Sequence, residues 1–416
     1  EEEHGSVRLP RSAGGKGRRE ADEANKPAEV EAIEAFLFSQ AEFRHNVITH
    51  HCEIRWTEEA GFLPLTDRDV NTLWGRMNKT VGRVYLTDIY NVIHSEFVPL
   101  FNPFQSYFDH LPSWDGVSDP IGDLADTVHV KSDQAEFRDY FRKWFVGILP
   151  ALLDDTVVNH EILVLIGEQG LYKTTWFNFL LPPELRCYFY TKTNSDRLNK
   201  DDLFSLTEFA LICFEELDGM RPAELNQLKA MVTMPYVNER AAYGRNKERH
   251  PHIASFCGTG NNVQFLTDPT GNRRWLPFEV SQIRDPHLHA IPYELVYSQA
   301  YALWKSGFCH WFSQEEIRKL NMHNSRFEVP NLEEDLIRTH FRKPFEGEAG
   351  IFVTAADILE QISSCLRYPL SPNKIGRIMA GLEFESIRYK GKRGYIAVKK
   401  TGEDIDRERR SGALGL

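Results

Sequence analysis

The chain has 416 residues, which is enough for two or three domains with a sizeable core. Hydrophobic residues make up 42% and charged residues 26%, values that are ordinary for a soluble globular protein. The formal net charge of -11 argues against a protein that coats nucleic acid or membrane over its whole surface. Any contact with a polynucleotide therefore requires a local basic patch.

The six cysteines are scattered without a C-x-x-C pair, and no apolar run reaches the 18 residues of a membrane span. This pattern predicts reduced thiols in a cytoplasmic protein with no membrane partner. The histidines show no ligand spacing, so we expect no metal other than one carried by a nucleotide.

Residues 1–28 nearly lack large apolar side chains, so we expect a disordered linker. Residues 29–110 contain an amphipathic segment, VEAIEAFLFSQ, followed by NVITHHCEIRW, which alternates like a strand. In the next segment, TDRDVNTLWGRMN, Thr66 is the expected helix N-cap and Asp69 follows three residues later. These patterns predict a small α+β module in the N-terminal region.

Residues 111–310 have the pattern of an α/β domain. A helical lead-in over residues 117–150 precedes a core at residues 155–285. The core holds three apolar strand candidates, ILVLI, FALICF and IASFCGTG, which alternate with helix-like segments and so predict a parallel sheet. Residues 291–325 are again helical in pattern.

Residues 326–400 have the pattern of a separate small domain. Two helix-like segments, VTAADILEQISS and SPNKIGRIMAGL, come first. The segment that follows, FESIRYKGKRGYIAVKK, has the pattern of a strand, a Gly-Lys-Arg-Gly turn and a second strand. This order predicts a winged-helix-like domain. The tail at residues 401–416 is expected to be disordered.

The segment GEQGLYKTT follows the first strand candidate and nearly matches the phosphate-binding pattern G-x-x-x-x-G-K-[ST]. A triphosphate requires backbone N–H groups at a helix N-terminus, a lysine for the β- and γ-phosphates, and a hydroxyl for Mg²⁺. The loop would supply the amides, Lys173 the cation and Thr174 the hydroxyl, but Tyr172 stands where the pattern has glycine. The expected ATP-binding residues are Gly167, Glu168, Gln169, Gly170, Leu171, Tyr172, Lys173, Thr174 and Thr175. The alternative is an ordinary strand-to-helix turn that contains Lys-Thr.

Two carboxylates, Glu215 and Glu216, end the second strand candidate about 40 residues after the loop. In a P-loop ATPase one such carboxylate orients the Mg²⁺ shell, here together with Thr174, and the other positions the attacking water. The alternative is that both acids are the solvated end of a strand.

The third strand candidate ends at Thr259 and Asn261, and an amide there can align the water against the γ-phosphate. The next segment, DPTGNRRWLPFEV, holds Arg273 and Arg274, and arginine suits the charge of a transferring phosphoryl group. The arginine can act within its own subunit or on a neighbour, and the second case requires a homo-oligomer, most simply a ring. A salt bridge to Asp268 or Glu279 is the alternative.

Together GEQGLYKTT, CFEELDGM, ERAAYGRNKERHPHIASFCGTGN and FLTDPTGNRRW resemble the virulence-associated E family, whose catalytic core is similar to superfamily III helicases and their AAA+ relatives. The resemblance implies a RecA/AAA+-like P-loop core and an ATPase of phages and other mobile elements, often fused to or encoded with a primase. By this resemblance Lys173 and Thr174 match the phosphate lysine and magnesium hydroxyl. Glu215 and Glu216 match the acidic pair, Asn261 the polar sensor, and Arg273 or Arg274 the arginine finger. The chain departs from the family pattern at Tyr172 and at HPH, residues 250–252.

Two basic segments are candidate contacts for single-stranded DNA. In motors like those of superfamily III, a hairpin before the sensor strand enters the central channel and grips the strand with basic and aromatic side chains. The corresponding basic residues here are Arg240, Arg245, Lys247 and Arg249, although Glu239 and Glu248 also allow a solvated hairpin of mixed charge. In the C-terminal domain, Lys390, Lys392 and Arg393 would lie at the tip of the wing, which can contact phosphates or another protein.

The sequence therefore predicts an ATP-dependent, helicase-like DNA motor or replication-initiation ATPase that uses ATP and Mg²⁺. One alternative is a nucleotide-binding switch or loader with weak hydrolysis, which Tyr172 would favour. The other is a non-enzymatic adaptor that docks on DNA or protein.

Overall fold

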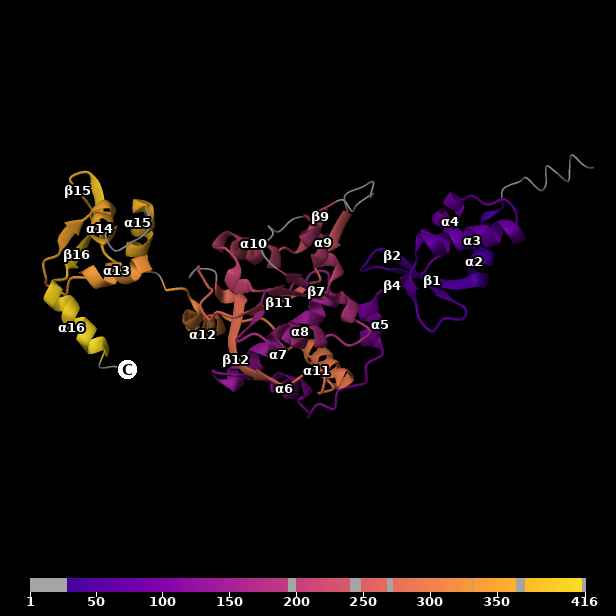
Figure 1. The fold of residues 1–416 in the computed structure, drawn as a ribbon, viewed down its shortest axis with the longest axis horizontal. Coiled ribbons are helices and arrows are strands. Elements are labelled where there is room, and N and C mark those ends of the chain that lie inside the picture. The colour runs from indigo at the N-terminus through magenta and orange to yellow at the C-terminus, as the bar shows by residue number, and fades with distance from the viewer. Residues whose placement is uncertain are drawn as a thin grey trace, which may run out of the picture. The chain divides into compact units, whose positions relative to one another are not determined.

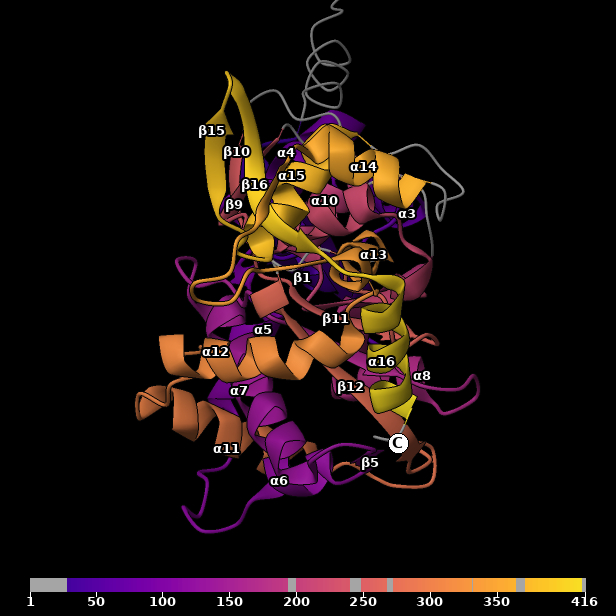
Figure 2. The ribbon, with the colours of Figure 1, turned by 90° about the vertical axis from the view of Figure 1, so that its left-hand side faces the viewer.

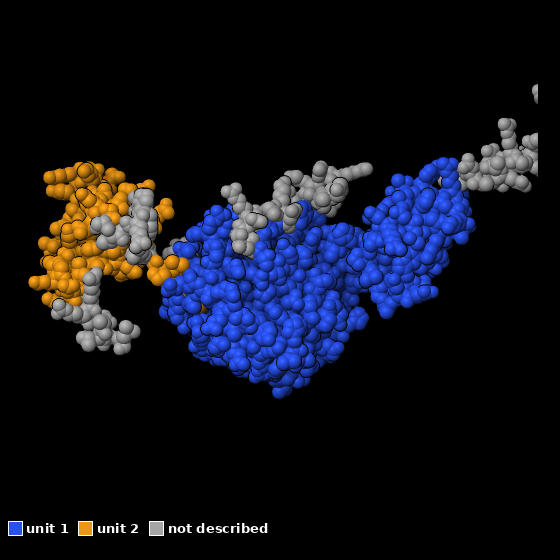
Figure 3. Space-filling model, in the orientation of Figure 1, with its two compact units in different colours: residues 1–326 blue, residues 327–416 orange. Residues whose placement is uncertain are grey.

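The computed structural model describes residues 28–193, 200–239, 248–267, 272–330, 332–363 and 371–413. The chain divides into two compact units, residues 1–326 and 327–416, which Figure 3 shows in different colours. Unit 1 contains the N-terminal module and the large α/β core (Figure 1). Among the described helices, none is both long and apolar enough to cross a membrane.

The N-terminal module is α+β, as predicted. Its elements are α2 (Val30–Gln40), β1 (Ala41–Asn46), β2 (His51–Trp56), β3 (Leu63–Pro64), α3 (Asp67–Thr80), α4 (Leu86–Ile93) and β4 (Leu100–Phe101), with sheet order β3-β2-β1-β4. The predicted cap of α3 is confirmed, because the Thr66 side chain accepts from the Asp69 backbone and Asp69 accepts from the Thr66 backbone.

The prediction of one strand over NVITHHCEIRW was wrong, because the structure has a turn between β1 and β2. The side-chain oxygen of Asn46 accepts from the backbone N–H groups of Ile48 and Thr49, at 3.0 and 3.2 Å. His50 then adopts a left-handed conformation with φ 56°. Such a side-chain bond to the backbone competes with strand extension and reverses the chain.

The core domain is built on a six-stranded sheet with the order β5-β12-β6-β11-β8-β7, in which only β5 pairs antiparallel with its neighbour. Its strands are β5 (Val128–Val130), β6 (Ile162–Ile166), β7 (Phe189–Thr193), β8 (Leu211–Glu215), β11 (Ser255–Gly260) and β12 (Trp275–Ile283). The three predicted strands are confirmed as β6, β8 and β11. Strands β7 and β12 were not predicted. The prediction of a helical lead-in over residues 117–150 was wrong in part, because β5 lies between α6 and α7 in this segment.

The helices of the core lie on both sides of this sheet, with α9 and α10 opposite α6, α7 and α11 in Figure 1. They are α5 (Pro103–Asp109), α6 (Pro120–Ala125), α7 (Gln134–Leu153), α8 (Lys173–Phe179), α9 (Lys200–Glu208), α10 (Pro222–Val232), α11 (Tyr293–Lys305) and α12 (Gln314–Asn324). Short 3-10 turns are η1 (Arg186–Tyr188), η2 (Leu217–Gly219), η3 (Asn272–Arg274) and η4 (Ser325–Phe327). A separate hairpin of β9 (Tyr236–Glu239) and β10 (Glu248–Pro251) precedes β11.

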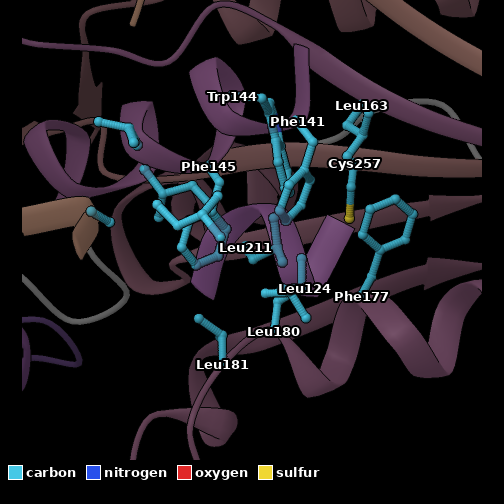
Figure 4. Packing of buried hydrophobic residues seen from close by; sticks show 14 of the residues in the cluster. Leu124, Phe141, Trp144, Phe145, Leu163, Phe177, Leu180, Leu181, Leu211 and Cys257 are labelled. Carbon is cyan, nitrogen blue, oxygen red and sulfur yellow. The ribbon is translucent and has the colours of Figure 1, made fainter. Parts of the chain in front are cut away.

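Helix α7 is packed against the sheet through aromatic side chains. Figure 4 shows Phe141, Trp144 and Phe145 among apolar residues of β6, α8, β8 and β11. Trp144 is fully buried and its indole N–H donates to the backbone carbonyl of Phe256, at 2.9 Å. This contact fixes α7 against β11, the strand beside β6.

Unit 2 has the predicted order of two helices followed by a β-hairpin, and Figure 2 shows that hairpin beside α15. Its elements are α13 (Leu332–His340), β13 (Phe341–Arg342), β14 (Ile351–Val353), α14 (Ala355–Ser363), α15 (Pro372–Gly381), β15 (Ser386–Tyr389), β16 (Lys392–Lys399) and α16 (Gly402–Ala413). The sheet order is β13-β16-β14, and β15 also pairs with β16.

Unit 2 differs from the prediction in three respects. Helix α13 and the short strands β13 and β14 precede the two predicted helices and were not predicted. The hairpin turns at Lys390 and Gly391, with φ 47° and 79°, so Lys392 and Arg393 lie on β16 rather than in the turn. The expected disordered tail contains α16. Its first turn is capped by the Thr401 hydroxyl, which accepts from the Asp404 backbone at 3.3 Å, a local signal that composition does not reveal.

Candidate functional site

The loop between β6 and α8 begins where a fully buried strand ends. All five residues of β6 are apolar and buried, and β6 is paired on one side with β11 and on the other with β12. The backbone N–H of Gly167 donates to the carbonyl of Gly260, at 3.1 Å. A Cβ at Gly167 would lie 2.9 Å from the carbonyl oxygen of Val280, so the close approach of β12 requires glycine here.

The loop closes through two left-handed residues, Gly170 with φ 84° and Tyr172 with φ 59°. Tyr172 is the residue that precedes α8, and its side chain is exposed, with 41% of its surface accessible. The tyrosine therefore adopts a backbone conformation that favours glycine, while its ring stays out of the protein interior.

Lys173 is folded back into the loop. Its ammonium group donates to the backbone carbonyls of Gly167 and Glu168, at 2.6 and 2.7 Å, and lies 3.4 Å from the side-chain oxygen of Asn261. Burial lowers the pKa of Lys173, and the nearby Asp218 carboxylate opposes this shift. The lysine thus occupies the centre of the loop, next to the end of β11.

The Thr174 hydroxyl donates to a carboxylate oxygen of Glu215, at 2.7 Å. Glu215 is the last residue of β8, so this bond joins the first turn of α8 to the end of β8, which is separated from β6 by β11 in the sheet. Glu216 follows in a left-handed conformation with φ 54° and is exposed, and its carboxylate forms no hydrogen bond with a described residue. A hydroxyl and a carboxylate side by side are oxygen ligands of the kind that Mg²⁺ prefers, so these residues fit that ion.

These side chains surround one cleft of about 360 Å³ at the carboxyl ends of β6, β8 and β11. Its volume is within the range of about 300–1,000 Å³ that is usual for small-ligand sites. The lining residues are Gln169, Gly170, Leu171, Tyr172, Lys173, Thr174, Thr175, Glu215, Glu216, Thr259, Gly260 and Asn261. Of the predicted loop residues, Gly167 and Glu168 contribute carbonyls to Lys173 rather than cleft surface.

Sequence reasoning assigned no role to Asp218, which lies in η2 just after the acidic pair. Its two carboxylate oxygens accept from the backbone N–H groups of Asn261 and Asn262, at 3.1 Å each. A Cβ at Gly260 would approach an Asp218 oxygen to 3.1 Å, so the glycine lets the two segments meet. Asp218 positions the turn that carries Asn261, and its only sequence signal is its place in FEELDG.

Arg273 and Arg274 lie away from this cleft. They precede β12, whose first residue, Trp275, pairs with Ile162 at the amino end of β6. With a rise of about 3.3 Å per residue, the five residues of β6 separate the arginines from the loop by about 16 Å. Neither arginine forms a close ion pair with a described residue, and Glu279 instead bonds Lys131 at 2.7 Å.

The two arginines differ in their surroundings. Arg273 is exposed, whereas Arg274 is partly buried. Burial lowers the pKa of Arg274, with a further contribution from Arg273, and Glu161 opposes the shift. Burial raises the pKa of Glu161 to about 7. Arg274 is thus partly enclosed by its own subunit, whereas Arg273 is accessible at the surface.

The β9–β10 hairpin is present, and its base adjoins the amino end of β11. Arg249 is exposed and its guanidinium lies 3.5 Å from the centre of the Tyr236 ring. Arg240, Arg245 and Lys247 lie outside the described residues. On the wing of unit 2, Lys390, Lys392 and Arg393 are all exposed.

The two histidines of HPH are buried at the base of this hairpin. A ring nitrogen of His252 lies 2.6 Å from the carbonyl oxygen of Met234, and burial lowers its pKa to about 4. The His250 ring packs edge-on against His50 of the N-terminal module, with centroids 4.9 Å apart. These histidines therefore attach the hairpin to its surroundings, which is a structural use of the positions where the family pattern differs.

The model of the virulence-associated protein E-like domain matches residues 109–329. The chain belongs to the virulence-associated protein E-like family. The matched domain includes the cleft, the β9–β10 hairpin and the arginine pair, while the N-terminal module and unit 2 lie almost wholly outside it.

The chain is also similar to solved structures described as the C-terminal region of NrS-1. The apo structure of residues 305–718 of that protein has a TM-score of 0.47 and 12% identity, covering 89% of this chain and 99% of that one. An A form apo structure of the same region has a TM-score of 0.45 and 11% identity, with the same coverage. No curated protein matches the chain.

Tyr172→Gly tests the left-handed conformation before α8. A non-glycine residue in this conformation costs about 1 kcal/mol, so we expect the variant to be as stable as the wild type or more stable by up to about 1 kcal/mol. The free energy of unfolding in urea measures the effect. Leu171→Gly, next to it but without a positive φ, is the matched control and should lose stability. A marked loss in Tyr172→Gly would contradict the assigned conformation.

Proposed function

We propose that this protein is an ATPase with a RecA/AAA+-like P-loop core that acts on single-stranded DNA during replication of a phage or other mobile element. The observation that carries the proposal is the convergence of Lys173, the Thr174–Glu215 pair, Glu216 and Asn261 on one cleft. In open α/β sheets, ligands bind outside the carboxyl ends of the strands, which is where this cleft lies. Membership of the virulence-associated protein E-like family supports the same assignment.

In this proposal the triphosphate binds over the loop backbone and the N-terminus of α8, where N–H groups and the helix dipole favour negative charge. Lys173 exchanges the carbonyls of Gly167 and Glu168 for phosphate oxygens. Thr174 and Glu215 would hold Mg²⁺, which neutralises charge on the β- and γ-phosphates when bound.

The proposed reaction transfers the γ-phosphoryl group to water. The water oxygen forms a bond to the γ-phosphorus while the bond to the bridging oxygen breaks, giving ADP and phosphate, and the water protons pass to the products and solvent. In this proposal Glu216, whose carboxylate has no hydrogen bond to a described residue, orients that water, and Asn261 lines the same cleft. Preorganised groups of this kind act by positioning and by stabilising developing charge.

The position of the arginine pair is consistent with an arginine that acts in the cleft of a neighbouring subunit. A separation of about 16 Å along β6 is too long for a guanidinium to reach the cleft of its own subunit. Arg273 is the better candidate, because it is exposed while Arg274 lies beside Glu161. The proposed active form is therefore a homo-oligomer, most simply a ring, that completes each cleft with an arginine from the next subunit.

Single-stranded DNA is the proposed partner of the β9–β10 hairpin, and the wing of unit 2 is a second candidate contact. A primase, fused or separate, is a further proposed partner. A nucleotide-binding switch with weak hydrolysis is the second candidate function. The observation that favours it is that the Lys173 ammonium group forms two hydrogen bonds to backbone carbonyls of its own loop, and a bound nucleotide must replace both.

Lys173→Ala should abolish hydrolysis, because it removes the cation for the transferring phosphoryl group. We expect DNA-stimulated ATP turnover to fall by about 100-fold or more, as for other preorganised groups. Lys131→Ala, which removes an exposed lysine paired with Glu279, is the control and should keep wild-type turnover. Turnover measured with and without single-stranded DNA decides between the candidates. Tight ATP binding without turnover in the wild type would favour the switch, and absence of nucleotide binding would contradict both.

Mixing two inactive variants tests action in trans. Arg273→Ala keeps an intact cleft but lacks the arginine, whereas Lys173→Ala keeps the arginine but has a defective cleft. Each alone should be inactive, and a mixture should recover part of the ATP turnover because mixed oligomers contain complete sites. No recovery in a mixture that is shown to co-assemble would contradict the assignment of Arg273.

A further inference from the structure

A second cavity lies between the N-terminal module and the core domain. Its volume is about 670 Å³, again in the range of about 300–1,000 Å³ for small-ligand sites. One wall includes Arg44, Phe62 and Phe101, and the other includes Tyr188, Glu208 and Phe209. Because Tyr188 directly precedes β7 and Phe209 lies two residues before β8, the cavity lies at the amino edge of the sheet, opposite the proposed ATP cleft.

Three contacts hold the Arg44 side chain in this cavity and leave its two terminal amino groups available to a ligand. Its guanidinium lies 4.1 Å from the ring centre of Phe62 and 3.6 Å from that of Phe101, and its Nε donates to Glu53 at 2.5 Å. The two terminal amino groups form no hydrogen bond with a described residue. A guanidinium fixed in this way presents two N–H groups to the paired oxygens of a phosphate or carboxylate.

The opposite wall offers groups of a different kind. Glu208 is partly buried, its carboxyl group forms no hydrogen bond with a described residue, and its pKa is raised because burial disfavours its charged form. Its carboxyl oxygens can accept from an amino group of a ligand. The Tyr188 and Phe209 rings beside it supply an aromatic wall of the type on which nucleobases pack. An anion on Arg44 and an amino-bearing aromatic group beside Glu208 are features of one nucleotide.

The cavity adjoins the candidate DNA-binding hairpin. His50, in the turn that leads into the cavity-lining strand β2, packs against His250 of β10. Glu208 lies near both His51 and His250, whose charges oppose the rise of its pKa. Arg249 of β10 is exposed next to these histidines. A strand bound along the hairpin would therefore pass the mouth of the cavity.

We propose that this cavity binds one nucleotide of single-stranded DNA, with a backbone phosphate on Arg44 and an amino-bearing base beside Glu208. This inference rests on the DNA-binding part of the proposed function. A protein partner's carboxylate would also match Arg44, but it would leave Glu208 and the aromatic wall without a role.

The test compares Arg44→Gln with Arg55→Gln as the matched control. Arg55 lies on β2 and also contacts Phe62, but its guanidinium bonds Glu42 instead of lining the cavity. Binding of a short oligodeoxycytidine is measured by fluorescence anisotropy over a range of salt concentrations. We expect Arg44→Gln to weaken binding by about tenfold, the effect of one lost charge-assisted contact. The slope of log affinity against log salt should fall by about 0.7, and Arg55→Gln should change neither.

Glu208 is tested through base preference. The wild type should bind oligodeoxycytidine more tightly than oligodeoxythymidine, because thymine has no amino group, and Glu208→Gln should narrow the difference. Thermal unfolding of each variant with and without ATP checks the fold and the ATP cleft, both of which should be unchanged.

Three results would overturn the proposal. The first is wild-type DNA binding in Arg44→Gln, which would leave the cavity to another ligand such as an acidic protein segment. The second is an equal loss in Arg55→Gln. The third is binding of free deoxycytidine monophosphate with no effect of either cavity variant on DNA. If the wild type binds no DNA, the DNA-binding part of the proposed function fails with it, whereas ATP turnover is judged separately.

Discussion

The pairing of β6 on both of its edges is the constraint on which the rest of the core depends. Five buried apolar residues, Ile162 to Ile166, leave this strand no freedom to shift, since a shift by one residue would break its register with both β11 and β12. Trp144 fixes α7 to β11 from one face of the sheet. As a consequence, the loop after β6 starts at a fixed position along the sheet, close to the carboxyl ends of β8 and β11.

The parallel sheet also separates two groups of candidate functional residues, which lie at its opposite edges. Carboxylates, the loop lysine and Asn261 gather at the carboxyl ends of the strands, whereas the arginine pair, the β9–β10 hairpin and the second cavity lie at the amino ends. Two strands connect the edges directly. β11 runs from the hairpin to Asn261, and β12 runs from Arg273 past the loop, where the Val280 carbonyl limits residue 167 to glycine. Under the proposed function, these strands are the shortest physical connection between DNA or a neighbouring subunit and the ATP cleft.

Much of this arrangement was predictable from local patterns. The three most apolar strands, the capped helix after Thr66 and the helix–helix–hairpin order of unit 2 follow from periodicity and capping residues. The cleft residues were predictable because parallel strands place their carboxyl ends together. Features that depend on tertiary contacts were missed. β12 contains Pro277 and lacks a strict alternation, and the Asn46 turn depends on one side chain that replaces strand pairing.

The position of the arginine pair required the register of β12 against β6, which no motif contains. The use of Asp218 likewise depends on a contact between segments more than 40 residues apart. Tyr172 is the opposite case, because the loop pattern identified the position and the structure gave the conformation of the backbone there. A tyrosine thus adopts the left-handed backbone conformation at the position where the loop pattern has glycine.

A crystal structure with Mg²⁺ and a non-hydrolysable ATP analogue would test the central claim most directly. The triphosphate is predicted to lie over the backbone of residues 168–173, with the Lys173 ammonium group moved from the carbonyls of Gly167 and Glu168 to phosphate oxygens. Thr174 and Glu215 should then lie next to the magnesium ion. A nucleotide bound elsewhere, or a loop in which Lys173 keeps both carbonyl bonds while nucleotide is present, would contradict the assignment of this cleft.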